Sequence, residues 1–243
     1  MDRQTYDRMR ILQENHWWFR GRRSILTQLI GALELPTPAK VLEAGCGPGG
    51  NLAMLRRFGD VVAMEPDEES RAYAADRMGV WVEAGFLPDD LPFAPDSFDL
   101  VCAFDVIEHV DDDAASVKAL ARLIRPGGYF ATTVPGQPWM WSRHDELHHH
   151  KRRYRLRAYR GLFEAAGLEV VKASHFNTLL FPPIAAVRAV KMMTGSQSAD
   201  DDSMPPAPLN GLLGGLFAAE RHWLAHAPLP FGVSIVLIAR RPS

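Results

Sequence analysis

The sequence has few of the features that mark secreted or nucleic-acid-binding proteins. Its 243 residues include only two cysteines, Cys46 and Cys102, each inside an apolar run. This excludes a disulfide framework and suits reduced thiols in a cytoplasmic compartment. A formal charge of -2 at pH 7 gives no field that would gather nucleic acid, so no nucleic-acid partner is expected. The first residues show no basic segment followed by an apolar stretch, so we expect no secretory signal.

The sequence also lacks an apolar run long enough to cross a membrane. Its most apolar stretch, residues 179–190, is interrupted by Pro182, Pro183 and Arg188. It is shorter than the roughly 20 residues that a spanning helix needs. A peripheral membrane contact stays open, so the expected location is cytoplasmic with membrane association as an alternative.

Apolar and polar segments alternate along the first 135 residues in the manner of an α/β protein. Hydrophobic residues make up 47% of the chain and charged residues 23%, which is ordinary for a soluble globular domain. Apolar periodicity predicts strands at 40–44, 60–64, 80–82, 98–104 and 129–134, with helices at 51–58, 70–78 and 114–123. The expected fold is a doubly wound, Rossmann-like sheet that is mostly parallel and binds ligands at the carboxyl ends of its strands.

The last third of the chain is expected to close this sheet and to carry an insertion. A helix at 157–166 precedes strands at 168–173 and 233–240, which could form an antiparallel pair. The expected organisation is an N-terminal helical lid at 1–35, a cofactor-binding domain at 36–175 and 232–243, and a helical insertion or substrate cap at 176–231. Residues 194–208, rich in Ser, Asp and Pro, are expected to form a mobile loop.

A glycine turn at residues 43–50 follows the first predicted strand. Glycines permit a tight turn and close approach of backbone to a ligand. Glu65 ends the second strand about 20 residues later, where a carboxylate can accept ribose hydroxyls. Both features suit either NAD or S-adenosylmethionine. Glu43 favours the second cofactor, because its charge would repel a pyrophosphate but attract an ammonium or a sulfonium.

Five segments in order resemble the motifs of class I, type 11-like S-adenosylmethionine-dependent methyltransferases. They are VLEAGCGPG at 41–49, VAMEP at 62–66, LPF with SFDLV at 91–101, DVIEHV at 105–110 and LIRPGG at 123–128. Five ordered motifs are far more specific than one glycine turn. The resemblance implies a methyltransferase that uses S-adenosylmethionine and releases S-adenosylhomocysteine.

The resemblance also assigns roles to individual residues. The glycine turn should hold the methionyl part of the cofactor, and Glu65 its ribose. The implied cofactor-binding residues are Glu43, Gly45, Gly47, Glu65, Pro66, Phe86, Leu87, Asp105, Val106 and His109. Many relatives have Asp where this chain has Phe86, so the side-chain acceptor for the adenine amino group is missing or replaced by backbone.

The N-terminal segment HWWFRGRR at 16–23 resembles a subset of these enzymes. Aromatic side chains beside arginines could cover the cofactor, with Arg20 reaching its carboxylate. The alternative is an amphipathic helix that docks Trp17 or Trp18 on the core.

The acceptor site is expected in the segment after the strand at 129–134. His144 beside Asp145 offers a titratable base with an orienting carboxylate, and His150 offers a second base. The same subset of relatives has a similar pattern of His-Asp, His and Arg-Arg-Tyr. His144 and His148 have the spacing of a helical metal pair, but no cysteine or second pair supports them, so no metal is expected. A charged surface helix is the remaining alternative.

The apolar side chains of the insertion suit a small-molecule or lipid-like acceptor, although they could instead pack on the sheet, on a membrane or in a homodimer. We expect methylation at oxygen or nitrogen rather than carbon. Two other functions stay open: a nucleotide-dependent oxidoreductase that uses the same turn, and a partner subunit that binds the cofactor without catalysis.

Overall fold

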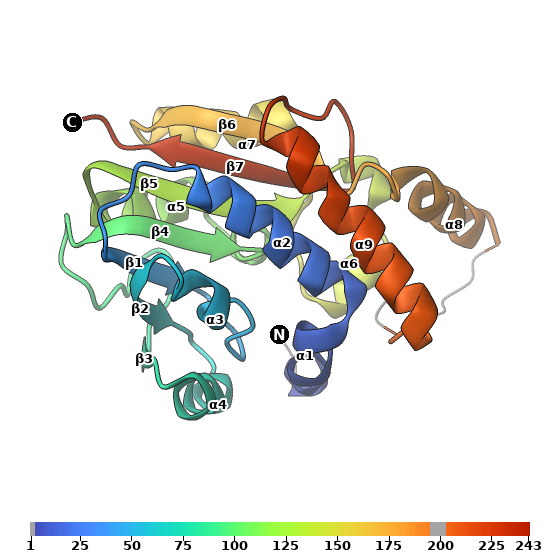
Figure 1. The fold of residues 1–243 in the computed structure, drawn as a ribbon, viewed down its shortest axis with the longest axis horizontal. Helices are drawn as coiled ribbons and strands as arrows, with labels where there is room; N and C mark the ends of the chain where they lie inside the picture. The colour runs from blue at the N-terminus through green and yellow to red at the C-terminus, as the bar shows by residue number, and fades with distance from the viewer. Residues whose placement is uncertain (1–2, 195–202) are drawn as a thin grey trace.

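The computed structural model describes residues 3–194 and 203–243, which form a seven-stranded sheet covered by helices on both faces (Figure 1). The strand order is β3-β2-β1-β4-β5-β7-β6. The strands are β1 (Ala39–Ala44), β2 (Gly59–Met64), β3 (Trp81–Glu83), β4 (Phe98–Phe104), β5 (Ile124–Pro135), β6 (Glu169–Phe176) and β7 (Ser234–Arg240). Only β7 runs antiparallel to its neighbours β5 and β6. The predicted Rossmann-like fold with an antiparallel C-terminal strand is therefore confirmed.

The central strands are apolar on both sides because helices cover both faces of the sheet. Leu42 and Val101 pack in the cluster that contains α5 and α7, whereas Val41 and Leu100 pack in the cluster with α2 and α9. Figure 1 shows α2 and α9 in front of the sheet and α5 and α7 behind it. The parallel pairing of β1 with β2 and β4 brings their carboxyl ends to one edge.

Polar caps begin the helices that follow β2 and β4. The Asp67 carboxylate accepts a hydrogen bond from the Ser70 N–H, and the Asp112 carboxylate accepts one from the Ala115 N–H, both at 2.8 Å. The helices are α1 (Arg3–Asn15), α2 (Trp17–Gly31), α3 (Leu52–Leu55), α4 (Glu68–Met78), α5 (Asp113–Leu123), α6 (Arg143–Leu147), α7 (Leu156–Ala165), α8 (Phe181–Thr194) and α9 (Ala207–Leu224), with short 3₁₀ turns η1 (Ile107–His109) and η2 (Pro138–Met140).

Two elements differ from their predicted extent. The helix expected at 51–58 shortens to α3, because residues 56–58 turn back toward β2. The Pro-Gly-Gly segment at 126–128, which precedes the strand predicted at 129–134, lies within β5 where its register against β4 shifts. Gly127 has a φ of 80° and its N–H donates to the Arg241 carbonyl. Glycine accommodates this irregular strand because it adopts positive φ without strain.

The insertion contributes to the core as well as to the rim of the molecule. Helix α9 packs so closely along α2 that a Cβ atom on Gly21 would overlap the Phe217 ring. The Asn210 side chain accepts from the Trp17 N–H and donates to the Asn15 carbonyl, each at 2.8 Å. The junction of α1 and α2 is therefore tied to the insertion.

Of the loop expected at 194–208, residues 195–202 lie outside the described residues. Across the described chain, every helix is too short or too polar to cross a bilayer.

Candidate active site

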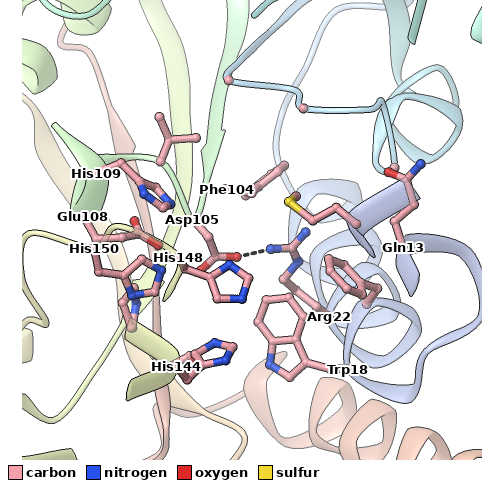
Figure 2. A pocket seen from close by; sticks show the side chains of 18 of the residues that line it. Gln13, Trp18, Arg22, Phe104, Asp105, Glu108, His109, His144, His148 and His150 are labelled. Carbon is pink, nitrogen blue, oxygen red and sulfur yellow. Dashed lines mark hydrogen bonds and ion pairs between the residues drawn. The ribbon is translucent and has the colours of Figure 1, made fainter. Parts of the chain in front are cut away.

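A cavity of about 740 Å³ opens at the carboxyl edge of β1, β2 and β4. Figure 2 shows its two sides: Arg22 and Trp18 come from α2, and the histidines come from η1 and the region of α6. Asp105 lies between them at the end of β4. The cavity therefore joins the predicted cofactor residues to the predicted acceptor residues.

The glycine turn has the backbone conformation that its sequence requires. Gly45 and Gly47 have φ values of 69° and 53°, in the left-handed region that favours glycine. A Cβ atom on Gly45 would lie 2.7 Å from Cγ2 of Val106, so no larger residue fits there. The Gly47 N–H donates to Oε2 of Glu65 at 2.8 Å. The turn thus fixes the orientation of the Glu65 carboxylate at the cavity wall.

Glu43 is a buried carboxylate directly behind the turn. Its Oε1 accepts a hydrogen bond of 2.7 Å from Asn51, which lines the cavity, and its Oε2 is buried with no hydrogen-bond partner among the described residues. Burial raises the pKa of Glu43 to about 7. A buried acceptor without a donor is costly, so this end of the site suits a cationic ligand group.

Replacing Glu43 with glutamine should flatten the pH dependence of stability in the ligand-free protein. The unfolded carboxyl ionises near its usual pKa of about 4.3, whereas the folded one ionises near 7. The wild type should therefore lose stability as pH rises between these values, and the variant should not. Melting temperatures measured from pH 4 to 8 would check this; parallel curves for both proteins would contradict it.

The predicted adenine end lies beside Glu65. Pro66, Phe86 and Leu87 line the cavity there, and the Phe86 side chain is 59% exposed. Paired backbone hydrogen bonds of 2.8 and 2.9 Å join Phe86 to Asp90 and fix this loop. Phe86 is thus available as a flat apolar surface for a base.

The cation at the cofactor end is Arg22 rather than Arg20. The structure places Arg20 on the exposed side of α2, outside the cavity lining. Arg22 is buried, forms an ion pair with Asp105, and lies 4.5 Å from the Trp18 ring centroid. It also donates to Oδ1 of Asn51 at 3.3 Å. Arg22 is therefore the residue placed to bind a ligand carboxylate.

The residue that Asp145 orients is His150. Oδ1 of the fully buried Asp145 lies 2.9 Å from Nδ1 of His150 and accepts from Nε of Arg153 at 2.7 Å. Burial by itself would raise the pKa of Asp145, but the His150 hydrogen bond and the Arg153 charge outweigh it and lower that pKa. The sequence had paired Asp145 with its neighbour His144; the left-handed turn at His149, with a φ of 56°, instead brings His150 back to it.

Histidine rings gather on this wall of the cavity (Figure 2). His109 lies 4.8 Å from His150 between ring centroids, and His144 lies 4.3 Å from His148. Burial, followed by the charges of His150 and His148, lowers the pKa of His109 to about 3. Burial is also the main cause of the lowered pKa of His150. Both rings are therefore neutral near pH 7, and a neutral imidazole can offer the lone pair of one ring nitrogen to a ligand.

Helices α8 and α9 supply the apolar end of the cavity. Their lining side chains are Pro183, Ile184, Val187 and Leu213, joined by Leu180 just before α8. Arg188 adds a buried cation there and donates to the Met140 carbonyl at 2.7 Å. An acceptor at this end would meet apolar walls with a few polar groups.

Most of the predicted site residues come together around this cavity. Those that line it are Gly45, Gly47, Glu65, Pro66, Phe86, Leu87, Asp105, Val106, His109, His144 and His150. Glu43 and Asp145 support the wall from behind, through Asn51 and His150 respectively. The group fits a nucleoside cofactor with an amino-acid tail: glycines that exclude side chains, a buried carboxylate for hydroxyls, and a buried arginine for a carboxylate.

Comparisons with known proteins find methyltransferases. A family model described as "Methyltransferase domain" matches residues 16–173. A probable S-adenosylmethionine-dependent methyltransferase of Mycolicibacterium smegmatis is 32% identical over 163 residues, which cover 65% of this chain and 62% of that protein. A ubiquinone biosynthesis O-methyltransferase of Alkalilimnicola ehrlichii is 33% identical over 115 residues, 44% of this chain and 45% of that protein.

Solved structures support the fold. The methyltransferase solved in complex with the Haloferax volcanii Trm112 methyltransferase activator superposes with a TM-score of 0.63, over 98% of this chain and 95% of that one. At 18% identity this likeness shows the architecture alone. The matches to the two curated relatives span less than two thirds of the length of each.

Proposed function

Because the chain belongs to the S-adenosylmethionine-dependent methyltransferases, we propose that it methylates a small-molecule or lipid-like acceptor at oxygen or nitrogen. The cofactor is S-adenosylmethionine, with S-adenosylhomocysteine as its product. The observation that carries the proposal is one continuous cavity that runs from the glycine turn, past the histidines, to the apolar walls of α8 and α9. Both substrates of a methyl transfer can lie in it end to end.

The bound cofactor supplies a methyl group on a sulfonium that leaves as a neutral thioether. The protein contributes positioning and exclusion of water, which supply most of the catalysis in a displacement of this kind. Arg22 holds the carboxylate of the amino-acid tail and Glu65 holds the ribose hydroxyls. Trp18 and Gln13 from the N-terminal helices cover the cavity, so the N-terminal segment acts as a lid.

His150 is the residue best placed to take a proton from the acceptor. Its Nδ1 donates to Asp145, which leaves Nε2 as the proton acceptor. The lowered pKa of His150 keeps the ring neutral and ready to act near pH 7. His144 lies 6.2 Å from His150 between ring centroids and is the second candidate base.

The apolar end of the cavity supports the acceptor class. Pocket walls of Leu180, Ile184 and Leu213 suit an aromatic ring or an acyl chain. The O-methyltransferase of ubiquinone biosynthesis among the relatives agrees with a hydroxylated apolar acceptor, although it matches under half of this chain.

The test is methyl transfer from labelled S-adenosylmethionine to a panel of phenols, catechols, amines and acyl carboxylates. S-adenosylhomocysteine should raise the melting temperature, and apolar acceptors should give labelled product. Cofactor binding without any product would favour a non-catalytic subunit. Binding of NADH in place of S-adenosylhomocysteine would favour an oxidoreductase.

Replacing Ile184 with asparagine should weaken binding of the acceptor and leave binding of the cofactor unchanged. Loss of an apolar wall contact of about 1.5 to 3 kcal/mol raises KM roughly 10- to 100-fold for an apolar acceptor. Leu212→Asn is the matched control, because Leu212 is exposed on α9 and outside the cavity lining. Equal KM values in the two variants would place the acceptor elsewhere.

We propose a cytoplasmic location with peripheral membrane contact through α8 and α9. Exposed apolar side chains on and beside these helices support this: Leu179, Val187, Val190, Met193, Leu209, Leu212, Leu216 and Trp223. Co-sedimentation with lipid vesicles would test it. A dimer in solution, detected by light scattering, would instead assign the same surface to a second copy.

A further inference from the structure

A carboxylate and two imidazoles converge on the cavity wall between β4 and α6. Glu108 and His109 come from η1, and His150 follows α6. Their candidate ligand atoms all lie within 4.8 Å of one another, and Figure 2 shows the three side chains together. We propose that they bind one divalent transition-metal ion, with zinc as the best match.

The state of Glu108 is the strongest reason for a cation. Its side chain is fully buried, and within the described chain neither carboxylate oxygen accepts a hydrogen bond from another residue. Burial, together with the nearby Asp105 charge, raises the pKa of Glu108 well above its usual range. A buried carboxyl group without donors is costly. A cation between Glu108 and the histidines would satisfy both oxygens.

Both histidines are already oriented in the way that metal ligands are. His150 uses Nδ1 for its 2.9 Å hydrogen bond to Asp145. His109 is hydrogen-bonded to the backbone of His149. A metal-binding histidine usually donates its second ring N–H to a carboxylate or a carbonyl. Each ring therefore keeps one nitrogen for a metal, and Asp145 and the His149 backbone act as the supporting partners.

The ligand set indicates which metal would bind. Two imidazole nitrogens and one carboxylate match zinc sites that keep a fourth position open. Magnesium and calcium prefer oxygen ligands. Ligands of a tetrahedral zinc ion lie about 3.4 Å apart, whereas the candidate atoms lie within 4.8 Å of one another, so they must approach by up to about 1.4 Å on binding. The fourth position would face the cavity, since all three residues line it.

The sequence had pointed to a different pair and to no metal. His144 and His148 have helical spacing, but their rings lie 6.2 and 5.9 Å from that of His150. His150 lies about 40 residues after the adjacent Glu108 and His109 in the sequence, so no local spacing reveals the three ligands together. Only the fold brings η1 against the end of α6.

An ion at this position would act on the acceptor molecule. This catalytic role rests on the proposed function, whereas binding of the metal by the three side chains does not. With the ion bound, Nε2 of His150 is a metal ligand and no longer the base. A hydroxyl at the fourth position would have a lowered pKa and would pass its proton to the His144 imidazole instead. Its oxygen then bonds to the methyl carbon while the carbon–sulfur bond breaks and its electron pair stays on sulfur.

The test uses Co²⁺ as a spectroscopic probe for zinc in chelator-treated full-length protein. Wild type should bind one equivalent with the visible absorption of a tetrahedral cobalt site, and Zn²⁺ should displace it. Glu108→Gln and His150→Gln should each lose roughly 10- to 100-fold or more in affinity. His222→Gln is the control, because His222 is exposed on α9 and should bind as wild type does.

Two results would overturn the proposal. One is a wild type that binds no Co²⁺ while S-adenosylhomocysteine still raises its melting temperature, which would leave the methyltransferase function intact. The other is equal Co²⁺ affinity in wild type and in folded Glu108→Gln and His150→Gln variants. Should one of these variants fail to fold, His109→Gln replaces it in the same comparison.

Discussion

Alanine at position 65 is expected to abolish stabilisation of the protein by S-adenosylhomocysteine. Glu65 is buried at the cavity wall and is held by the N–H groups of Gly47 at 2.8 Å and Asp67 at 3.0 Å. Its carboxylate can accept two ribose hydroxyls, each a charged hydrogen bond of about 1.5 to 3 kcal/mol. Losing both weakens binding by roughly 100-fold or more. Calorimetric titration with S-adenosylhomocysteine measures this directly.

The control for this variant is Glu68→Ala. Glu68 is exposed in the first turn of α4, three residues after Glu65, and its loss should leave cofactor affinity unchanged. Glu65→Gln should fall between the two, because the amide retains one acceptor but no charge. If Glu65→Ala binds the cofactor as well as Glu68→Ala does, the ribose lies elsewhere and the assignment of the glycine turn fails with it.

Most of the sheet could be predicted because its strands are local patterns. The run at 98–104 is apolar apart from Asp99 and forms β4 over the same residues. The limits of α3 and β5 could not be predicted in this way. The shortened α3 depends on how residues 56–58 return to β2, and the start of β5 depends on a register shift against β4. Both are set by neighbouring strands rather than by local periodicity.

The residues that line the cavity near the glycine turn were also largely predictable, because they follow strands in ordered motifs. Arg22 was missed, although a helical pattern contains the signal. Arg22 lies three and four residues before Ile25 and Leu26, which are buried on α2, so it shares their inward face. Arg20 does not share that face. Helical periodicity therefore predicts that Arg22, and not Arg20, faces the interior.

The acceptor side was harder to predict because its contacts are not local. The orienting role of Asp145 was expected, but its partner is set by the turn at His149. Glu108 lies inside a recognised motif, and nothing in the sequence shows that its carboxylate is buried without donors. Burial and partner identity are properties of the packed structure, and these decide what Glu108 and His150 can bind.

Replacing Asp145 with asparagine should destabilise the fold by about 3 to 5 kcal/mol. The substitution keeps the volume but leaves Arg153, whose side chain is 3% exposed, without its 2.7 Å carboxylate partner. It also weakens the bond that orients His150 and the hydrogen bond of 2.9 Å from the Ser142 N–H. Thermal and urea unfolding would measure the loss. Asp111→Asn is the control, because the Asp111 side chain is 89% exposed in its pair with Lys151, and exposed pairs contribute about 0 to 1 kcal/mol.

The pH dependence distinguishes a lost charge from a lost shape at Asp145. Its pKa is lowered in the folded protein, so its contribution is present above the unfolded pKa of about 3.9 and declines as pH falls below about 5. Wild-type stability should therefore drop between about pH 5 and pH 2 more steeply than that of Asp145→Asn. If stability falls with pH at the same rate in the wild type and in Asp145→Asn, and the variant is still destabilised at pH 7, the effect comes from hydrogen-bond geometry rather than from charge. Since the His150 ring is oriented by the same carboxylate, the charge that stabilises this wall of the cavity also keeps the proposed base in position.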